Sequence, residues 1–237
     1  MKFSSELIPA TLIRRYKRFL ADVSLDNGAE VLTVHTPNTG SMLGCAQPGS
    51  RVWLRDSGNP SRKYRLGWEL SSSETGTLIG VNTHLANQLV REGIETGVIT
   101  ELQGYASLRQ EVRYGEEGSR IDLLLQHTAR PPCYIEVKNV TLLREEGVVA
   151  FPDAVSQRGT KHLRELTSLV RQGYRAVLLF CVQRGDAEVV EPARAIDPDY
   201  ADTLRLAMQQ GVEVLAYRAQ LTTTEIYLQT RLPFRLA

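Results

Sequence analysis

Cysteine is scarce in this chain of 237 residues: there are three, and none of them forms a Cys-x-x-Cys pair. An odd number of separated cysteines argues against a disulfide framework and against a zinc ribbon. Long hydrophobic runs are also missing, because the longest, residues 176–182, has seven apolar residues, whereas a membrane-spanning helix needs about 20. The N-terminus lacks the apolar core of a secretory signal peptide. These absences predict a soluble, cytoplasmic protein with no membrane partner.

Neither sign of charge dominates, since the formal net charge is +1. Residues 1–80 hold ten Lys and Arg against seven Asp and Glu, whereas residues 81–237 hold 18 against 20. The basic residues of the first part form two clusters: Arg14, Arg15, Lys17 and Arg18, and then Arg51, Arg55, Arg62, Lys63 and Arg65. Such clusters attract polyanions. A solvated strand surface is the competing interpretation, and composition alone favours it.

The spacing of apolar and turn-forming residues changes near residue 80. Before that point, short strand-like runs alternate with Gly and Pro turns, which predicts a small barrel or sandwich, and residues 71–77 resemble a Ser/Thr-rich linker. After it, apolar spacings predict helices over residues 83–95, 153–172 and about 198–210, with strands at 105–114, 120–126, 133–138, 175–182 and 212–217. We therefore expect a domain over residues 1–80 and an α/β domain with a mixed sheet over residues 81–237.

The most informative residues are Asp122 and Glu136, with Lys138 two positions further on. A turn-rich segment joins their strands, and a hairpin centred on Ala129 would place Asp122 directly opposite Glu136, with Cβ atoms about 5 Å apart. Lys138 would then point to the same face, because side chains alternate along a strand. A register shift of one residue would separate the two carboxylates.

Two opposed carboxylates destabilise a sheet unless something compensates their charge. Mg²⁺ or Mn²⁺ would do so, and Mg²⁺ is held in proteins by one or two carboxylates together with water and phosphate oxygens. A neighbouring ammonium group can stabilise negative charge on a phosphate. Asp122, Glu136 and Lys138 therefore suit metal-assisted phosphodiester hydrolysis. The alternative is an amphipathic surface strand on which Lys138 merely pairs with a carboxylate, and the short motif alone favours that alternative.

The order of elements around the motif resembles the PD-(D/E)xK restriction-endonuclease-like core, whose second and third strands carry the Asp and the Glu-x-Lys. The position before Asp122 is Ile121 rather than proline. In that family a glutamate of the first helix often joins the metal site, which implies Glu92, or less well Glu95. The helix after the strands commonly contributes phosphate contacts, which implies Lys161 and His162; an exposed helix face is the competing interpretation.

Several further segments narrow the resemblance. They are residues 35–42 (HTPNTGSM), 62–64 (RKY), 81–83 (VNT) with Ala86-Asn87, 120–122 (RID), 136–142 (EVKNVTL), 151–154 (FPDA) and 158–163 (RGTKHL). Together and in this order they resemble the sugar fermentation stimulation protein A (SfsA) family almost end to end. That resemblance implies an N-terminal OB-like barrel, a PD-(D/E)xK-like domain, DNA binding with little sequence preference, and a role in regulating sugar (maltose) metabolism in prokaryotes. It does not settle whether the protein cuts DNA.

An OB barrel binds nucleic acid in a groove lined by basic and aromatic side chains. The candidates for phosphate contacts are Arg14, Arg15, Lys17, Arg18, Arg62, Lys63, Arg65 and, on the later helix, Lys161. Tyr16, Trp53, Tyr64 and Trp68 are candidate stacking surfaces, although for the two tryptophans a place in the core is the favoured interpretation.

Three hypotheses remain. The first is a DNA-binding regulator, the second a Mg²⁺- or Mn²⁺-dependent nuclease, and the third an RNA-binding protein. DNA binding is the favoured one, with double-stranded DNA as the expected partner and a homodimer left open.

Overall fold

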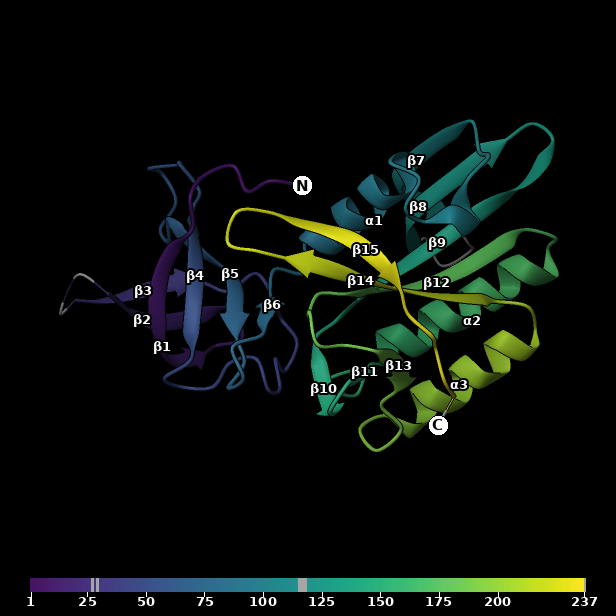
Figure 1. The fold of residues 1–237 in the computed structure, drawn as a ribbon. Helices are drawn as coiled ribbons and strands as arrows, with labels where there is room; N and C mark the ends of the chain where they lie inside the picture. The colour runs from purple at the N-terminus through teal and green to yellow at the C-terminus, as the bar shows by residue number, and fades with distance from the viewer. Residues whose placement is uncertain (27, 29, 115–118, 237) are drawn as a thin grey trace.

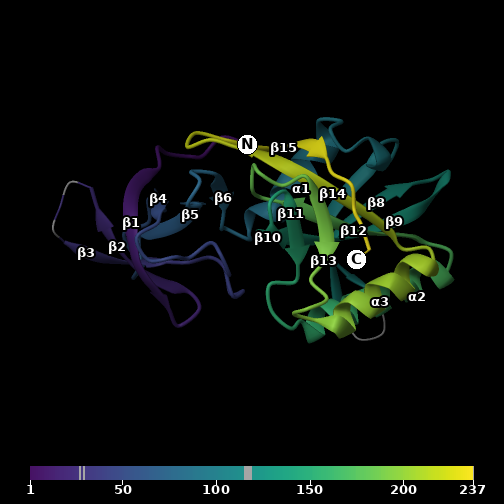
Figure 2. The same ribbon diagram turned by 60° about the horizontal axis from the view of Figure 1, so that its bottom comes forward.

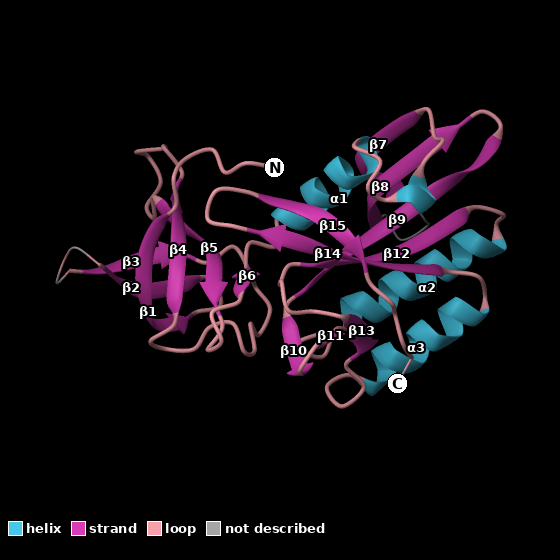
Figure 3. Ribbon diagram, viewed as in Figure 1, coloured by secondary structure: helices cyan, strands magenta, loops and turns pink. Residues whose placement is uncertain are grey.

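The computed structural model describes residues 1–26, 28, 30–114 and 119–236. Two β-sheet units lie next to each other, the first drawn in purple and blue and the second in teal, green and yellow (Figure 1). The described residues before Gly80 form only strands, turns and loops, and the helices belong to the second unit (Figure 3). No helix in the described ranges has the length and the apolar character needed to cross a bilayer.

The N-terminal unit is a closed barrel, in line with its short strands separated by Gly and Pro. Its strands are β1 (Ile8–Tyr16), β2 (Leu20–Leu25), β3 (Val31–His35), β4 (Arg51–Asp56), β5 (Leu66–Ser72) and β6 (Leu78–Gly80). They are ordered β3-β2-β1-β4-β5-β6, and a parallel pairing of His35 with Gly67 joins β3 to β5 and closes the sheet on itself. Trp68 is fully buried in the barrel, where its Nε1 donates a hydrogen bond to the Leu70 carbonyl (2.9 Å). This confirms the prediction that Trp68 is a core residue.

Trp53 is half-buried and packs against a second core that both units share. Leu7 and Leu70 of the N-terminal unit and Leu85 and Leu89 of the C-terminal unit belong to this core. The two units therefore fold against each other through apolar contacts as well as through hydrogen bonds.

The C-terminal unit is built on a six-stranded sheet in the order β15-β14-β12-β9-β8-β7. Its strands are β7 (Ser107–Tyr114), β8 (Ser119–His127), β9 (Arg130–Val140), β12 (Arg175–Val182), β14 (Glu213–Leu221) and β15 (Ile226–Arg231). The central strands β9, β12 and β14 are parallel, whereas β7, β8 and β15 run antiparallel to their neighbours. The predicted mixed sheet is therefore confirmed.

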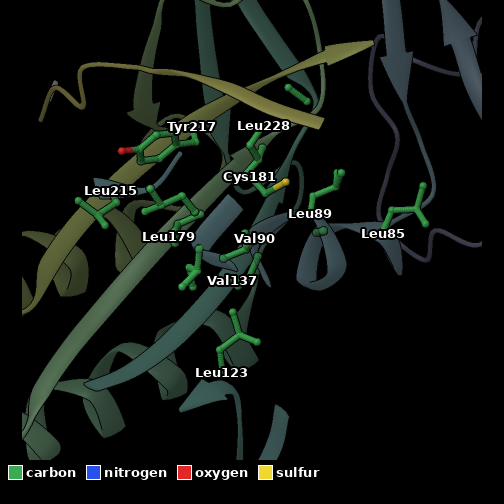
Figure 4. Packing of buried hydrophobic residues seen from close by; sticks show 14 of the residues in the cluster. Leu85, Leu89, Val90, Leu123, Val137, Leu179, Cys181, Leu215, Tyr217 and Leu228 are labelled. Atoms are coloured by element: carbon green, nitrogen blue, oxygen red, sulfur yellow. The ribbon is translucent and has the colours of Figure 1, made fainter. Parts of the chain in front are cut away.

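Helices cover both faces of this sheet. Leu89 and Val90 of α1 (Leu85–Glu95) pack with Leu123 and Leu179 of the sheet (Figure 4). On the other face lie α2 (Gln157–Arg171) and α3 (Pro198–Gln209), side by side (Figure 2). The helix predicted from residue 153 begins at Gln157, because the Ser156 hydroxyl accepts a hydrogen bond from the Gly159 amide (3.0 Å) and caps the first turn there.

A small sheet of β10 (Leu142–Glu145), β11 (Val148–Phe151) and β13 (Val189–Pro192) was not predicted. Each of its strands has four residues. Such short runs carry too little periodicity to be told from loops.

The β8–β9 hairpin has the predicted register. Leu123 pairs with Ile135, Leu124 with Tyr134 and Leu125 with Cys133, and each of these pairs is centred on Ala129. Continuing this register by one position places Asp122 opposite Glu136. Next to the turn, His127 pairs with Arg130, so a register shift lies between Leu125 and His127.

The loop over residues 38–42 fastens the barrel to the second unit. The Met42 amide donates to Asp153 Oδ2 (3.0 Å), and the Ser41 hydroxyl donates to the Asp153 carbonyl (2.7 Å). A Cβ on Gly40 would lie 2.8 Å from Asp153 Oδ2, so glycine permits this close approach. The loop is thereby held against the residues that precede α2.

The stability of the protein in acid will depend on Glu101, which lies in a short 3₁₀ helix, Thr100–Leu102. Burial works against its ionisation, but hydrogen bonds from the Tyr217 hydroxyl (2.5 Å) and Arg231 Nε (2.7 Å) outweigh it and hold the Glu101 pKa at about 2, below its ordinary 4.5. Because the folded-state pKa is depressed, the stabilisation is complete above about pH 4.5 and is lost as pH falls toward 2.

We therefore expect Glu101→Gln to lower the free energy of unfolding by about 1–2 kcal/mol at pH 6, because solvent screens these partly exposed charges, with the difference from wild type closing as pH falls to 2. Urea unfolding at several pH values measures this. A difference that stays constant with pH would contradict the assignment.

Candidate functional site

A cleft of about 530 Å³ lies where the two units meet. The N-terminal unit contributes Asn38, Thr39 and Gly40 to its wall. The C-terminal unit contributes residues of α1, β8, β9, β11 and α2, among them His84, Asn87, Asp122, Glu136, Lys138, Phe151, Arg158 and His162. The cleft thus contains the three residues that the sequence predicted as a catalytic set.

Asp122 is held in place by two hydrogen bonds from different elements. Asn87 Nδ2 on α1 donates to its Oδ1 (2.8 Å), and the Val137 amide on β9 donates to its Oδ2 (2.8 Å). Burial, followed by the negative charge of Glu136, raises the pKa of Asp122 to about 6. The two carboxylates are therefore close enough to repel each other, as opposed positions on paired strands require.

Glu136 is only 3% exposed. Its Oε1 accepts a hydrogen bond from Lys138 Nζ (2.6 Å) and contacts His162 Nδ1, whereas its Oε2 is buried without any hydrogen-bond partner. Burial works against ionisation, but Lys138 and then His162 outweigh it and lower the pKa of Glu136. An ionised carboxylate with one unpartnered buried oxygen is costly unless a further group binds it.

A divalent cation fits this arrangement. The unpartnered Glu136 Oε2 and the raised pKa of Asp122 are the two observations that a cation bound between the carboxylates would account for. In the described parts of the chain, no group of three His, Cys, Asp or Glu side chains is arranged to hold a metal ion. Two carboxylates can hold a hard cation only when water or phosphate oxygens complete its shell.

The structure corrects the expectation for Glu92. Its Oε2 accepts a hydrogen bond from the N-terminal ammonium of Met1 (2.9 Å), and it does not line the cleft. Glu95 instead pairs with Arg91 (2.8 Å) on the exposed face of α1. Glu92 lies five residues after Asn87, which places it about 140° further around the helix, and α1 therefore reaches the carboxylates through Asn87.

A second cavity of about 460 Å³ adjoins the cleft, and basic side chains of α2 and β8 line it. Its lining includes Lys161 and Arg158 of α2, Arg120 of β8, and Asp122 and His162, which also line the cleft. Lys161 Nζ lies 3.9 Å from Glu165 Oε1, and its contact with phosphate stays a prediction. Arg158 Nε also donates to His162 Nε2 (3.3 Å).

Two side chains that line the cleft were not predicted as site residues: Asn87, which bonds to Asp122, and Arg158, which bonds to His162. Both lie in segments that carried the family resemblance, and this was the available signal. Neither residue type reveals by itself that it faces carboxylates from another element.

The basic residues proposed for DNA contact in the barrel differ in their surroundings. Arg15 donates to the carbonyls of Arg18 (2.5 Å), Asn38 (2.9 Å), Gly40 (2.9 Å) and Ser41 (3.3 Å). Its guanidinium group therefore holds the loop that walls the cleft, which is a structural role in place of the predicted phosphate contact.

The other basic residues of the barrel are more exposed. Arg14 pairs with Asp22 (2.8 Å) and Arg65 with Asp56 (2.6 Å), while Lys63 lies over the Tyr64 ring. Lys17 and Arg18 are exposed at the β1–β2 turn, and Arg62 lines a third cavity beside His84. Arg62 therefore lines the cavity that shares His84 with the cleft, and the DNA contacts of all these residues stay predictions.

Comparison with known proteins matches the two units to two domain models of one protein family. A family model described as the SfsA N-terminal OB domain matches residues 13–81, and one described as the sugar fermentation stimulation protein RE domain matches residues 84–225. The first unit is therefore an OB barrel.

Full-length relatives agree with these models. The chain is 58% identical over 233 residues to a sugar fermentation stimulation protein homolog of Geobacter metallireducens, covering 98% of this chain and 99% of that one. It is 60% identical over 227 residues to the homolog of Pelobacter propionicus, with 96% of each covered. Among solved structures it resembles Pyrococcus furiosus SfsA in complex with Ca²⁺, with a TM-score of 0.87, 27% identity and coverage of 99% and 98%.

Proposed function

The chain belongs to the sugar fermentation stimulation protein (SfsA) family, and from this premise we propose that it binds DNA and cleaves it with a divalent metal ion. The observation that carries the proposal is the buried Glu136 Oε2 without a partner, next to Asp122 and Lys138. In this proposal residues 1–80 form a nucleic-acid-binding domain and residues 81–237 the catalytic domain.

Asp122 and Glu136 would hold the metal, which is Mg²⁺ or Mn²⁺ in this proposal. The Pyrococcus furiosus relative was solved with Ca²⁺, another hard cation that prefers oxygen ligands. A bound divalent ion would supply Lewis-acid polarisation of a phosphodiester and a water that ionises more easily.

The protein's own residues orient these groups. Asn87 and the Val137 amide fix the direction of the Asp122 carboxylate, while Lys138 and His162 bind Glu136 through Oε1 and leave Oε2 without a hydrogen bond. The Lys138 ammonium, 13% exposed, lies where it can stabilise negative charge that develops on a phosphate. Arg158 and Lys161 line the adjoining cavity, where they would hold the phosphate backbone.

The second candidate function is DNA binding without cleavage, in a regulator of sugar (maltose) metabolism. One observation favours it: Lys138 and His162 already compensate the charge on Glu136 Oε1 from within the protein. In that case the nuclease-like unit would serve as a phosphate-recognising scaffold, with little sequence preference because phosphate contacts carry no base information.

A DNA cleavage assay that compares wild type with Glu136→Gln distinguishes the two candidate functions. Supercoiled, linear and single-stranded DNA are incubated with wild type in Mn²⁺ and in EDTA. We expect cleavage only with the metal, and a loss of at least about tenfold in Glu136→Gln, since the amide retains an oxygen but loses the charge.

Glu92→Gln is the matched control, because it makes the same chemical change at a glutamate outside the cleft. Equal activity of wild type and Glu136→Gln, or DNA bound but left intact by wild type, would refute the nuclease proposal. The second result would leave the binding function standing.

A further inference from the structure

His162 lies at the centre of the hydrogen-bond network around Glu136. It belongs to the buried face of α2, is only 7% exposed, and lines both the cleft and the second cavity. Its Nδ1 contacts Glu136 Oε1, and its Nε2 accepts a hydrogen bond from Arg158 Nε (3.3 Å), one helical turn earlier. Both nitrogens of the ring are therefore engaged by the protein.

The bond from Arg158 decides which nitrogen of the ring carries the proton. A guanidinium group has only donors, so His162 Nε2 is the acceptor and is unprotonated. A neutral imidazole carries one proton, which is then on Nδ1. His162 therefore donates from Nδ1 to Glu136 Oε1. A proton on Nε2 would instead point at the Arg158 N–H.

The ammonium group of Lys138 agrees with this assignment. Its Nζ donates to Glu136 Oε1 (2.6 Å) and lies 3.5 Å from His162 Nδ1. The longer distance would be a hydrogen bond only if Nδ1 were the acceptor, which would place the ring proton on Nε2, against Arg158. Two donors that meet on one oxygen necessarily lie near each other, and this accounts for the 3.5 Å.

These bonds limit what His162 can do in the cleft. With Nδ1 bound to Glu136 and Nε2 bound to Arg158, no ring nitrogen remains to bind a phosphate, to ligate a cation or to take a proton from water. The ring can still hold the Glu136 carboxylate in one orientation. Oε1 receives donors from both His162 and Lys138, and Oε2 is the oxygen without a partner.

We infer that His162 is a positioning residue, which donates from Nδ1 to Glu136 Oε1 and thereby leaves Oε2 as the oxygen that binds a ligand. This inference rests on the proposed function only in taking that ligand to be a divalent cation. It gives His162 a role different from the phosphate contact that the nuclease-like resemblance implied. A partner that orients a metal ligand in this way raises the affinity of the site for the metal.

Nitrogen-15 NMR of the metal-free protein at about pH 8, where unperturbed histidines are neutral, tests the ring form directly. The chain has four histidines, and loss of one signal set in His162→Asn assigns the ring of interest. His127 is an internal reference, because its Nδ1 accepts from the Ala129 amide (3.0 Å) and its proton therefore lies on Nε2.

We expect His162 to show the pattern opposite to that of His127, with a protonated Nδ1 and an unprotonated Nε2. An Nε2–H ring at position 162, or one protonated on both nitrogens, would overturn the inference. Because this measurement needs neither metal nor DNA, it decides the ring form even if a variant fails to fold.

The pair His162→Asn and His162→Leu tests the positioning role. The two side chains have nearly the same shape, but only Asn retains an N–H donor close to the place of Nδ1. In calorimetric titration with Mn²⁺ we expect His162→Leu to lose at least about tenfold in affinity, and His162→Asn to stay within about threefold of wild type.

His127→Leu is the control, because it makes the same change at a histidine outside the cleft. Wild-type Mn²⁺ affinity in His162→Leu would overturn the inference, as would an equal loss of affinity in His162→Asn and His162→Leu.

The test separates this inference from the nuclease proposal. Mn²⁺ affinity that depends on the donor at position 162, in a protein that never cuts DNA, supports the positioning role and refutes the nuclease. Cleavage that depends on Glu136, together with wild-type Mn²⁺ affinity in His162→Leu, refutes the positioning role and supports the nuclease.

Discussion

Asp122→Ala will abolish Mn²⁺ binding in the cleft and reduce DNA cleavage by about 10²–10³-fold. The substitution removes one of the two carboxylates proposed to hold the metal and leaves Glu136 alone with Lys138 and His162, which already compensate its charge. One carboxylate so neutralised has little affinity for a divalent cation.

The same substitution will leave DNA affinity unchanged or improved in metal-free buffer, because it removes a negative charge that would repel the DNA phosphates. The fold should survive. The Asn87 amide and the Val137 amide lose their acceptor, at a cost of about 1–3 kcal/mol, but the repulsion between Asp122 and Glu136 is relieved at the same time.

Calorimetric titration with Mn²⁺, a cleavage assay and DNA anisotropy measure the three effects. Asp202→Ala is the control, because Asp202 is an exposed aspartate on α3 that pairs with Arg194 (2.6 Å). Unchanged Mn²⁺ affinity in Asp122→Ala would show that the metal site is elsewhere.

The second large effect concerns stability. Trp68→Ala will lower the free energy of unfolding by about 3–5 kcal/mol, because it removes the largest side chain of the barrel core and leaves a cavity. Trp68 is 0% exposed, and its indole N–H satisfies the buried Leu70 carbonyl. Trp68→Phe, which fills part of the space, should cost less.

Urea unfolding followed by circular dichroism measures this difference. If Trp68→Ala kept wild-type stability but lost affinity for DNA, Trp68 would be a stacking surface and its place in the core would be wrong. Trp53→Ala makes a useful comparison, since that indole is half-buried against the core shared by the two units.

Local patterns in the sequence predicted a large part of the fold. Gly and Pro between short strands indicated the barrel, and the apolar run of residues 175–182 predicted the buried strand β12. The pairing of Leu123–Leu125 matched the prediction, although a register shift between Leu125 and His127, next to the turn, was not predicted. The four-residue strands β10, β11 and β13 lacked such a pattern.

In the candidate site, too, some residues could be predicted from local sequence and others could not. Asp122, Glu136 and Lys138 lie on one hairpin, so their spacing along the chain was sufficient to bring them together. Asn87 and Glu92 lie on the same helix, and only the packing of α1 on the sheet decided which of them meets Asp122.

The sequence by itself therefore determined the short strands of the barrel, the β8–β9 hairpin and the three charged residues on it, because each depends on neighbours along the chain. Tertiary structure alone decided the rest. Only the folded structure shows that Arg15, a candidate phosphate ligand in the sequence, binds the carbonyls of the 38–42 loop. It also shows that Asp153 binds the same loop through the Met42 amide. These contacts join residues more than 20 positions apart in the sequence. Periodicity describes only near neighbours along the chain and therefore cannot predict them.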